Sequence, residues 1–249
     1  MLPRRTALAC LARTLLVNAA VTARGMQLVG QLYVLEPALR HLYPDQEKRA
    51  EAASRYLVHS NTHPYMLPFY VGTVLSLENL IAAGSLPGST VPVVRQTLGS
   101  TLSAIGDGFF EGALLPCWAL CCVSLLLCEL IAPALALTIL LFAALLAFRC
   151  CSFFYALKHG MAGLTGLKRL NLINWAGRIK LVNAALIVLI LWQLAPREAP
   201  LSPWDFGILS VGALLCAAWI VGRWRLPRII LWLLLLGALI FMDERLLGV

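Results

Sequence analysis

Charged residues are scarce in this sequence. Aspartate, glutamate, lysine and arginine make up 13% of its 249 residues, about half of the ~25% that is usual in soluble domains. Hydrophobic residues make up 60%, and the mean hydropathy is +0.82. This composition excludes an ordinary soluble domain and predicts an integral membrane protein.

The sequence also lacks the motifs of the common catalytic sites. It has no glycine-rich phosphate loop, no nucleophile elbow and no pair of carboxylates at catalytic spacing. We therefore predict a protein that is not an enzyme and needs no cofactor. The net charge of +8 does not indicate nucleic-acid binding, because the basic residues flank apolar runs and form no basic face with interleaved aromatic side chains.

Residues that bind metals are present but are poorly grouped along the chain. None of the eight cysteines belongs to a Cys-x-x-Cys pair. Cys117, Cys121 and Cys128 would share one helical face, which suits a soft ion such as Cu(I). The favoured interpretation is that the cysteines are small apolar residues that fill space between membrane helices. The four histidines do not cluster by spacing, so the sequence predicts no metal site.

The pattern of residues 1–60 predicts that they form a helical arm in the cytosol or at the membrane interface. Residues 6–24 have the mixed pattern of an amphipathic helix that lies on a surface. A second helix is expected over 26–42, broken or kinked at Pro37. Asp45 is expected to cap a third helix, which would run to the end of the arm.

Residues 61–180 are predicted to form a core inside the membrane. Residues 66–83 form a marginal span, and residues 91–105 are moderately apolar. The run 112–148 is too long for one crossing of about 20 residues, so it predicts a helical hairpin. Glu129 would lie deep in this run and would need a partner there.

The C-terminal part of the chain, residues 181–249, is expected to hold three more spans: 181–195, 206–222 and 227–242. The basic stretches 158–180 and 223–228 belong on the cytoplasmic side, which leaves the C-terminus outside. If the N-terminal arm is also inside, residues 61–111 must enter the membrane and return on the same side, as re-entrant or half-spanning segments.

The predicted fold is therefore an all-α integral membrane protein. It has N-terminal amphipathic helices, a re-entrant or half-spanning helical core and about five transmembrane helices. No cleavable signal peptide is recognisable in the sequence. We expect a multi-pass protein of the bacterial inner membrane, in contact with lipid, with its N-terminus in the cytoplasm.

The candidate ligand site is Asn61-Thr62-His63-Pro64-Tyr65, at the border between polar and apolar sequence. Polar side chains at such a border are costly to bury without a use, and the proline disfavours α-helical geometry at His63. A lone histidine here is most simply an interfacial hydrogen-bonding group. The crossing argument brings this segment near Gly106 and Asp107. Asp107 either caps the helix that follows it or accepts hydrogen bonds from backbone donors or from the hydroxyls of a sugar.

Four motifs match the pattern of a known family. Asn-Thr-His-Pro-Tyr is intact at 61–65, and Ile-Gly-Asp is intact at 105–107. An N-terminal pattern is matched from Met26-Gln27 to Leu42-Tyr43, and a later element is matched by Tyr155, Leu157-Lys158 and Gly160. With these motifs the chain resembles the IID membrane component of the mannose-family (mannose, fructose, sorbose and N-acetylgalactosamine) phosphoenolpyruvate-dependent sugar phosphotransferase systems.

This resemblance implies a channel for a hexose or an amino sugar, built with a IIC membrane partner as three IIC and three IID chains. The sugar would be phosphorylated in the cytosol by IIB, which is charged by IIA, so no residue of this chain would carry the phosphoryl group. Carried over by motif, the residues of the sugar path and the IIC contact are Asn61, Thr62, His63, Glu78, Gly106 and Asp107. Gly106 and Asp107 would lie at the tip of a re-entrant segment that faces the first motif.

Among the departures from the family pattern, two lie close to the Ile-Gly-Asp motif. After the Ile-Gly-Asp motif, the family's tryptophan is replaced by Glu111 and its arginine by Leu115. These changes keep an alternative function open, a non-transporting membrane receptor or scaffold that docks phosphotransferase proteins. A third hypothesis is an unrelated carrier of a metal or small solute that uses the cysteine face.

Overall fold

The computed structural model describes residues 2–194 and eight positions further on: Asp205, Gly207, Ile208, Val211, Gly212, Leu215, Cys216 and Trp219. The predicted spans 206–222 and 227–242 otherwise lie outside the described residues. Contacts divide the chain into two compact units, Met1–Leu186 and Ile187–Val249, and all candidate site residues belong to the first. The division into an arm, a core and C-terminal spans remains a prediction.

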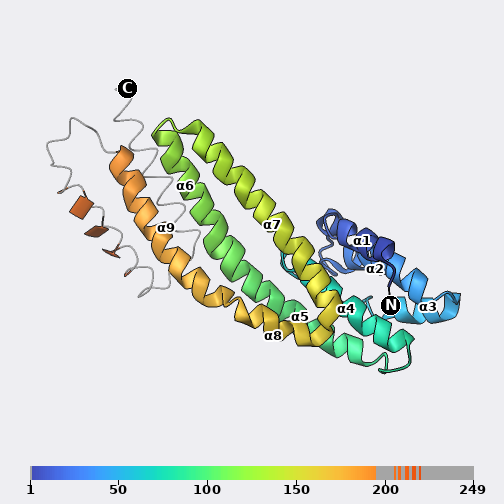
Figure 1. Ribbon diagram of the computed structural model, residues 1–249. Helices are drawn as coiled ribbons and strands as arrows, with labels where there is room; N and C mark the ends of the chain where they lie inside the picture. Colours follow the sequence, from blue (N-terminus) through green and yellow to red (C-terminus); the bar gives the residue numbers. More distant parts are fainter. Residues whose placement is uncertain are drawn as a thin grey trace. The chain divides into compact units, whose positions relative to one another are not determined.

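The described residues are helical and contain no β-strand (Figure 1). The α-helices are α1 (Arg4–Arg13), α2 (Leu28–Leu42), α3 (Gln46–Ser54), α4 (Leu67–Ala82), α5 (Thr90–Gly106), α6 (Leu115–Leu127), α7 (Ile131–His159), α8 (Gly163–Arg169) and α9 (Leu172–Leu194). Two 3₁₀ turns, η1 (Val17–Ala20) and η3 (Gly160–Ala162), and a π-helical stretch, η2 (Asp107–Leu114), complete the set.

The N-terminal arm differs from the sequence prediction in two places. The helix expected over 6–24 ends at Arg13, and the third helix ends at Ser54. In both places the chain beyond the helix makes tertiary contacts instead. Met26 and Ser60 form a parallel β-bridge, so the segments that follow α1 and α3 lie side by side. Contacts of this kind override a local helical pattern. The predicted cap of α3 is confirmed, because the carboxylate of Asp45 accepts a hydrogen bond from the backbone N–H of Lys48 at 2.9 Å.

The sequence predicts a break or a kink at Pro37. Helix α2 continues through this residue, so there is no break, and the kink stays a prediction. Proline has no N–H, which leaves the carbonyl of Tyr33 without its usual partner four residues on. The guanidinium of Arg13 on α1 donates to this carbonyl at 2.8 Å, and also contacts Glu36 at 2.9 Å. A side chain from the neighbouring helix therefore replaces the missing backbone donor.

Helix α4 has the bounds predicted for the marginal span, but protein surrounds most of it. Leu67 to Leu75, together with Leu77 and Glu78, are buried. The helix packs closely along α7: a Cβ at Gly72 would overlap the carbonyl oxygen of Phe153. Small residues let membrane helices approach in this way. This helix is thus a core element of the first unit.

Helices α5, η2 and α6 form one continuous helical stretch, Thr90–Leu127. The sequence Gly106-Asp107-Gly108 therefore does not break the chain, and Asp107 has helical backbone angles of −59° and −43°. Asp107 caps no helix and lies at no re-entrant tip, contrary to both expectations. The stretch widens to π-helical geometry at Asp107, and Asn183 of α9 donates to the carbonyl of Ala113 within it at 3.0 Å.

The predicted helical hairpin is confirmed as α6 and α7, although its first arm begins upstream of residue 112. Trp118 on α6 donates to the hydroxyl of Thr138 on α7 at 3.1 Å. Glu129 is exposed in the turn between the two helices, at a φ of +61°. It therefore does not lie deep in an apolar run. Beyond α7, the basic stretch 158–180 is not a loop, because it includes α8 and the start of α9.

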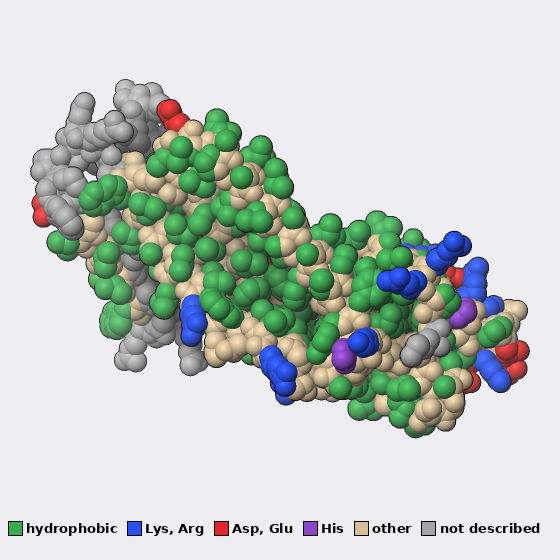
Figure 2. Space-filling model, in the orientation of Figure 1, with side chains coloured by type: hydrophobic (Ala, Val, Ile, Leu, Met, Phe, Trp, Pro, Cys, Tyr) green, Lys and Arg blue, Asp and Glu red, His purple; other side chains and the backbone are tan. Residues whose placement is uncertain are grey.

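Two stretches of the described chain are long and apolar enough to cross a membrane, Thr90–Leu127 and Ile131–Leu194. Only 17% and 11% of their most apolar windows are buried, which is unlike the core helices of a soluble protein. Hydrophobic side chains cover the outer surface of α6 and α7, whereas charged side chains gather over α1 to α3 (Figure 2). The described residues thus contain a polar end and a lipid-facing end in the first unit.

Candidate functional site

The segment 55–66 between α3 and α4 carries the Asn-Thr-His-Pro-Tyr motif, and Gln27 holds it in place. The side-chain amide of Gln27 donates to the carbonyl of Thr62 at 2.9 Å and accepts from the N–H of Thr62 at 2.9 Å. Its backbone N–H also donates to the carbonyl of Ser60 at 2.9 Å. Gln27 thus pairs with the loop as a neighbouring strand would, which gives the Met26-Gln27 motif a physical role.

Two buried arginines hold the same segment from other helices. Arg95 on α5 donates to the carbonyl of Arg55 at 2.6 Å and to the hydroxyl of Tyr70 at 3.0 Å. Arg149 on α7 donates to the carbonyl of Pro64 at 2.6 Å. Charge-assisted hydrogen bonds of this kind are among the strongest available to a backbone carbonyl. Neither arginine was assigned a role from the sequence, although Arg149 stands alone in an apolar run, which is itself a signal of function.

His63 packs directly against the second motif. Its side chain is buried, and its ring stacks on Phe110 with centroids 5.3 Å apart and an interplanar angle of 14°. A Cβ at Gly106 would overlap Cβ and Cγ of His63 and lie 2.8 Å from its Nδ1. The predicted proximity of residues 61–65 and 106–107 is confirmed. Glycine is required at 106 for close approach, not for a turn.

Two carboxylates approach the ring of His63. Nδ1 accepts the backbone N–H of Tyr65 at 3.3 Å, and Nε2 lies 3.5 Å from Oε1 of Glu111. The second contact is long and lacks hydrogen-bond geometry, so it is an ion pair only when the ring is protonated. Burial lowers the pKa of His63 below its usual value, and the negative charges of Glu111 and Asp107 partly offset this effect.

A polar groove of about 600 Å³ runs between this loop and α5. Its lining residues are Val58, His59, Ser60, Asn61, Pro92, Arg95, Gln96, Gly99, Ser100, Ser103, Ala104 and Asp107. The groove brings together Asn61 and Asp107, one from each motif. The hydroxyl of Ser103 lies 3.5 Å from the carboxylate of Asp107. Amide, hydroxyl and carboxylate groups together can bind a ligand rich in hydroxyls.

The other predicted site residues lie outside the groove lining. Thr62 is buried, and its hydroxyl oxygen has no hydrogen-bond partner among the described residues. His63 and Gly106 contact each other, and neither belongs to the groove lining. Glu78 belongs to a separate network.

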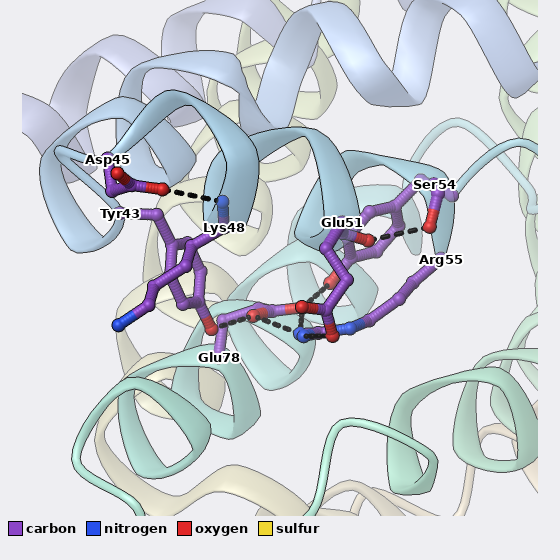
Figure 3. A network of polar contacts seen from close by, with 8 residues as sticks. Tyr43, Asp45, Lys48, Glu51, Ser54, Arg55 and Glu78 are labelled. Atoms are coloured by element: carbon purple, nitrogen blue, oxygen red, sulfur yellow. Dashed lines mark hydrogen bonds and ion pairs between the residues drawn. The ribbon is translucent and has the colours of Figure 1, made fainter.

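Figure 3 shows the network around Glu78. The hydroxyls of Tyr43 and Tyr56 each donate to its carboxylate at 2.6 Å, and Arg55 donates to both of its oxygens at 3.2 and 3.1 Å. Burial, followed by the hydrogen bond to Glu78, raises the pKa of Tyr43 to about 12. Since the carboxylate is saturated by these groups, its evident role is to join α2, the end of α3 and α4.

The cysteine face does not form a ligand cluster in the part of the chain that the structure describes. Cys117 and Cys121 are half-buried on α6, and Cys128 is exposed at its end. Among those residues, the one group of three metal-ligating side chains is His63, Asp107 and Glu111, whose ligand atoms lie within 4.8 Å of one another. A search of the sequence for spaced histidines and cysteines does not find this group. The one local signal is the four-residue spacing of Asp107 and Glu111, which places both on one face of a helix.

A family model for the mannose/fructose/sorbose family IID component of the phosphotransferase system (PTS) matches residues 1–194. The chain belongs to this family. The resemblance drawn from the sequence motifs is confirmed.

This IID component matches named relatives over part of their length. It is 32% identical to the fructose permease IID component of Bacillus subtilis (strain 168) over 136 residues. This stretch covers 54% of this chain and 48% of that protein. It is 32% identical to the PTS mannose-specific EIID component of Escherichia coli (strain K12) over 96 residues. This stretch covers 38% of this chain and 34% of that protein. The chain thus spans about half of the first relative and a third of the second.

Two solved structures resemble the IID component along its whole length. One, titled "Structure of membrane protein", has a TM-score of 0.78 and 19% identity. The other is the cryo-EM structure of the mannose transporter ManYZ with microcin E492, with a TM-score of 0.54 and 20% identity. In both cases the match covers 100% of this chain and 98% of the other. At such identities the likeness shows the fold alone.

Proposed function

We propose that this IID component forms, with a IIC membrane partner, the path by which a hexose or an amino sugar crosses the inner membrane. The polar groove that joins Asn61 and Asp107 is the observation that carries the proposal. Asn61, Gln96 and Ser100 are exposed along it, so a second membrane chain could close the groove over a sugar. Hydroxyl groups would replace their hydrogen bonds to water with bonds to these side chains.

The remaining parts of the transport cycle lie outside this chain. In the proposal IIB phosphorylates the sugar in the cytosol, IIA charges IIB, and this chain is not catalytic. The complex would contain three IIC and three IID chains. Basic residues near the apolar stretches support a multi-pass chain with its N-terminus in the cytoplasm and its C-terminus outside.

The proposal divides the candidate residues by their contacts. Asn61 and Asp107 would contact the sugar or the IIC chain directly. Thr62, His63 and Gly106 would fix the groove wall from behind. Glu78 would act at a distance, because its carboxylate is already bonded to Tyr43, Tyr56 and Arg55.

The test is sugar uptake in cells that express this chain with its IIC, IIB and IIA partners. Wild type is compared with Asn61→Ala and Asp107→Ala, and with Asn174→Ala as a matched control on the exposed surface of α9. Membrane levels and co-purification with IIC are measured for every variant. We expect both groove variants to lose uptake of phosphorylated sugar while they still assemble, and the control to retain it.

A different result would favour the second function. If wild type binds IIC yet accumulates none of a panel of hexoses and amino sugars, the chain is a receptor or scaffold instead. The observation that favours this alternative is Glu111, an exposed carboxylate placed beside the motif histidine.

A further inference from the structure

The geometry points to a binding site for a divalent transition-metal cation, represented by Zn²⁺, formed by His63, Asp107 and Glu111. One ring nitrogen of the histidine and one oxygen of each carboxylate lie within 4.8 Å of one another, and Nε2 lies 3.5 Å from Oε1 of Glu111. Asp107 and Glu111 are four residues apart on η2, and His63 reaches them from the loop before α4. This inference is independent of the proposed transport function.

The observation that favours a ligand is the state of Nε2 of His63. The side chain is 1% exposed, and this nitrogen has no hydrogen-bond partner among the described residues. Buried polar atoms are nearly always hydrogen-bonded, so a buried nitrogen without a hydrogen bond, 3.5 Å from the carboxylate of Glu111, is unusual. The phenyl ring of Phe110 and the close approach of Gly106 fix the direction in which it faces.

The separations suit one small cation. Zinc lies about 2.0–2.1 Å from an imidazole nitrogen and about 2.0–2.2 Å from a carboxylate oxygen, so two ligands of a tetrahedral site are roughly 3.4 Å apart. Nε2 of His63 and Oε1 of Glu111 are already 3.5 Å apart. Asp107 is exposed, and one oxygen of its carboxylate lies within 4.8 Å of the ligand atoms of the other two residues.

The donor set also indicates the class of metal. One imidazole and two carboxylates suit a borderline ion such as Zn²⁺ better than Cu(I), which prefers thiolates. Three protein ligands leave a fourth position for water. A metal on Nε2 requires the ring proton on Nδ1, so binding exchanges the 3.3 Å hydrogen bond from Tyr65 for a metal bond.

The surrounding charges permit binding. The two carboxylates give the cluster a negative charge, and the side chain of Glu111 is 64% exposed, so an ion can reach it from solvent. Two cations lie near the cluster. Arg149 is bonded to the carbonyl of Pro64, next to His63 in the chain, and Nζ of Lys180 would lie 3.9 Å from a Cβ placed on Gly112. Lys180 is exposed and can turn toward solvent when the metal enters.

The metal site can be separated from the sugar groove by mutation. Asp107 belongs to both, but Glu111 lines only the metal site. Glu111→Gln removes one metal ligand without changing the groove lining. Glu129→Gln is the matched control, since Glu129 is also an exposed glutamate, in the turn between α6 and α7.

The experiment is a Zn²⁺ titration of the purified full-length chain in detergent, without a histidine tag, followed by competition with a chromophoric chelator. Co²⁺ is then used as a spectroscopic probe, because thiolate ligands produce an intense charge-transfer band that nitrogen and oxygen ligands lack. We expect one equivalent of Zn²⁺ with a dissociation constant in the micromolar range. Glu111→Gln should weaken binding by at least about tenfold, and Glu129→Gln should leave it unchanged.

Three results would overturn the proposal: no binding by wild type at about 1 mM Zn²⁺, equal affinity in Glu111→Gln, or a thiolate band that assigns the ion to cysteine. Melting curves without metal show whether each variant is folded. Sugar uptake is not the readout, so a failure of the transport proposal leaves this test intact, and a negative titration leaves the transport proposal intact.

Discussion

Gly106 and Gly108 flank Asp107 on the same helical stretch, yet the structure predicts opposite outcomes for their replacement by alanine. A Cβ at Gly106 would overlap Cβ and Cγ of His63, whereas a Cβ at Gly108 has nothing within 4 Å. The overlapping atoms belong to the base of a buried side chain, so a rotamer change cannot remove the clash. The loop backbone would have to move.

The pair of variants isolates the cost of that clash. Each replacement gains about 0.5–1 kcal/mol from the better helix propensity of alanine, and this gain cancels in the comparison. Overpacking of a tight contact costs about 1–3 kcal/mol, so Gly106→Ala should be less stable than Gly108→Ala by that amount. For a chain of this size the difference corresponds to roughly 2–12 °C in melting temperature.

The assay is thermal unfolding of the full chain in one detergent at one scan rate, because unfolding of such proteins is often irreversible and rate-dependent. Uptake in the reconstituted system gives a second readout: Gly106→Ala should impair it by moving His63 and the groove wall, and Gly108→Ala should preserve it. Equal melting temperatures and equal uptake for the two variants would refute the reasoning that Gly106 is needed for contact with His63.

Three further predictions concern the contacts that hold the motif loop and its surroundings. Gln27→Ala should destabilise the chain by about 2–4 kcal/mol, because the buried N–H and carbonyl of Thr62 lose their partners, and Gln46→Ala at an exposed position should melt like wild type. Glu78→Gln should cost about 3–5 kcal/mol, since it removes the buried counter-charge of Arg55, whose side chain is only 12% exposed, and leaves only the exposed Glu51 at 3.4 Å. A similar loss in Glu51→Gln, where the glutamate is 73% exposed, would contradict this account. Because the pKa of Tyr43 is raised to about 12 from about 10 in the unfolded chain, the folded state holds this proton more tightly, and stability should fall as the pH rises from about 10 to 12. Melting temperatures across that range should fall less steeply in Tyr43→Phe, and an identical slope would exclude the assignment.

Local signals in the sequence predicted the features that depend on neighbouring residues. The cap by Asp45 requires only an aspartate followed by a helix-forming segment, and it is present. The bounds of α2 and α4 and the α6–α7 hairpin likewise follow from apolar periodicity and length. The approach of the two motifs was predicted from crossing parity, and the contact between Gly106 and His63 confirms it, although the continuous helix at Asp107 shows that the re-entrant tip assumed in that argument is absent.

The misses share one physical cause, which is that a distant side chain or backbone decides the local structure. Glycine serves either in a turn or in a close contact, and Gly106-Asp107-Gly108 gives no local sign of which applies. Pro37 remains inside a helix because Arg13, 24 residues earlier, bonds the carbonyl that proline leaves free. Tertiary partners of this kind are not encoded in the periodicity of either segment.

The loop that carries Asn61 is fixed by its backbone, while the side chain of Asn61 remains exposed. Three side chains donate hydrogen bonds to the backbone carbonyls of the loop: Gln27 to Thr62, Arg149 to Pro64 and Arg95 to Arg55. These anchors come from the start of α2, from α7 and from α5, so the position of Asn61 depends on the packing of all three helices. A binding group on an immobilised backbone loses little conformational entropy when a ligand arrives. Removing an anchor should therefore weaken sugar transport in the same direction as removing Asn61 itself, but with a loss of thermal stability that Asn61→Ala does not show.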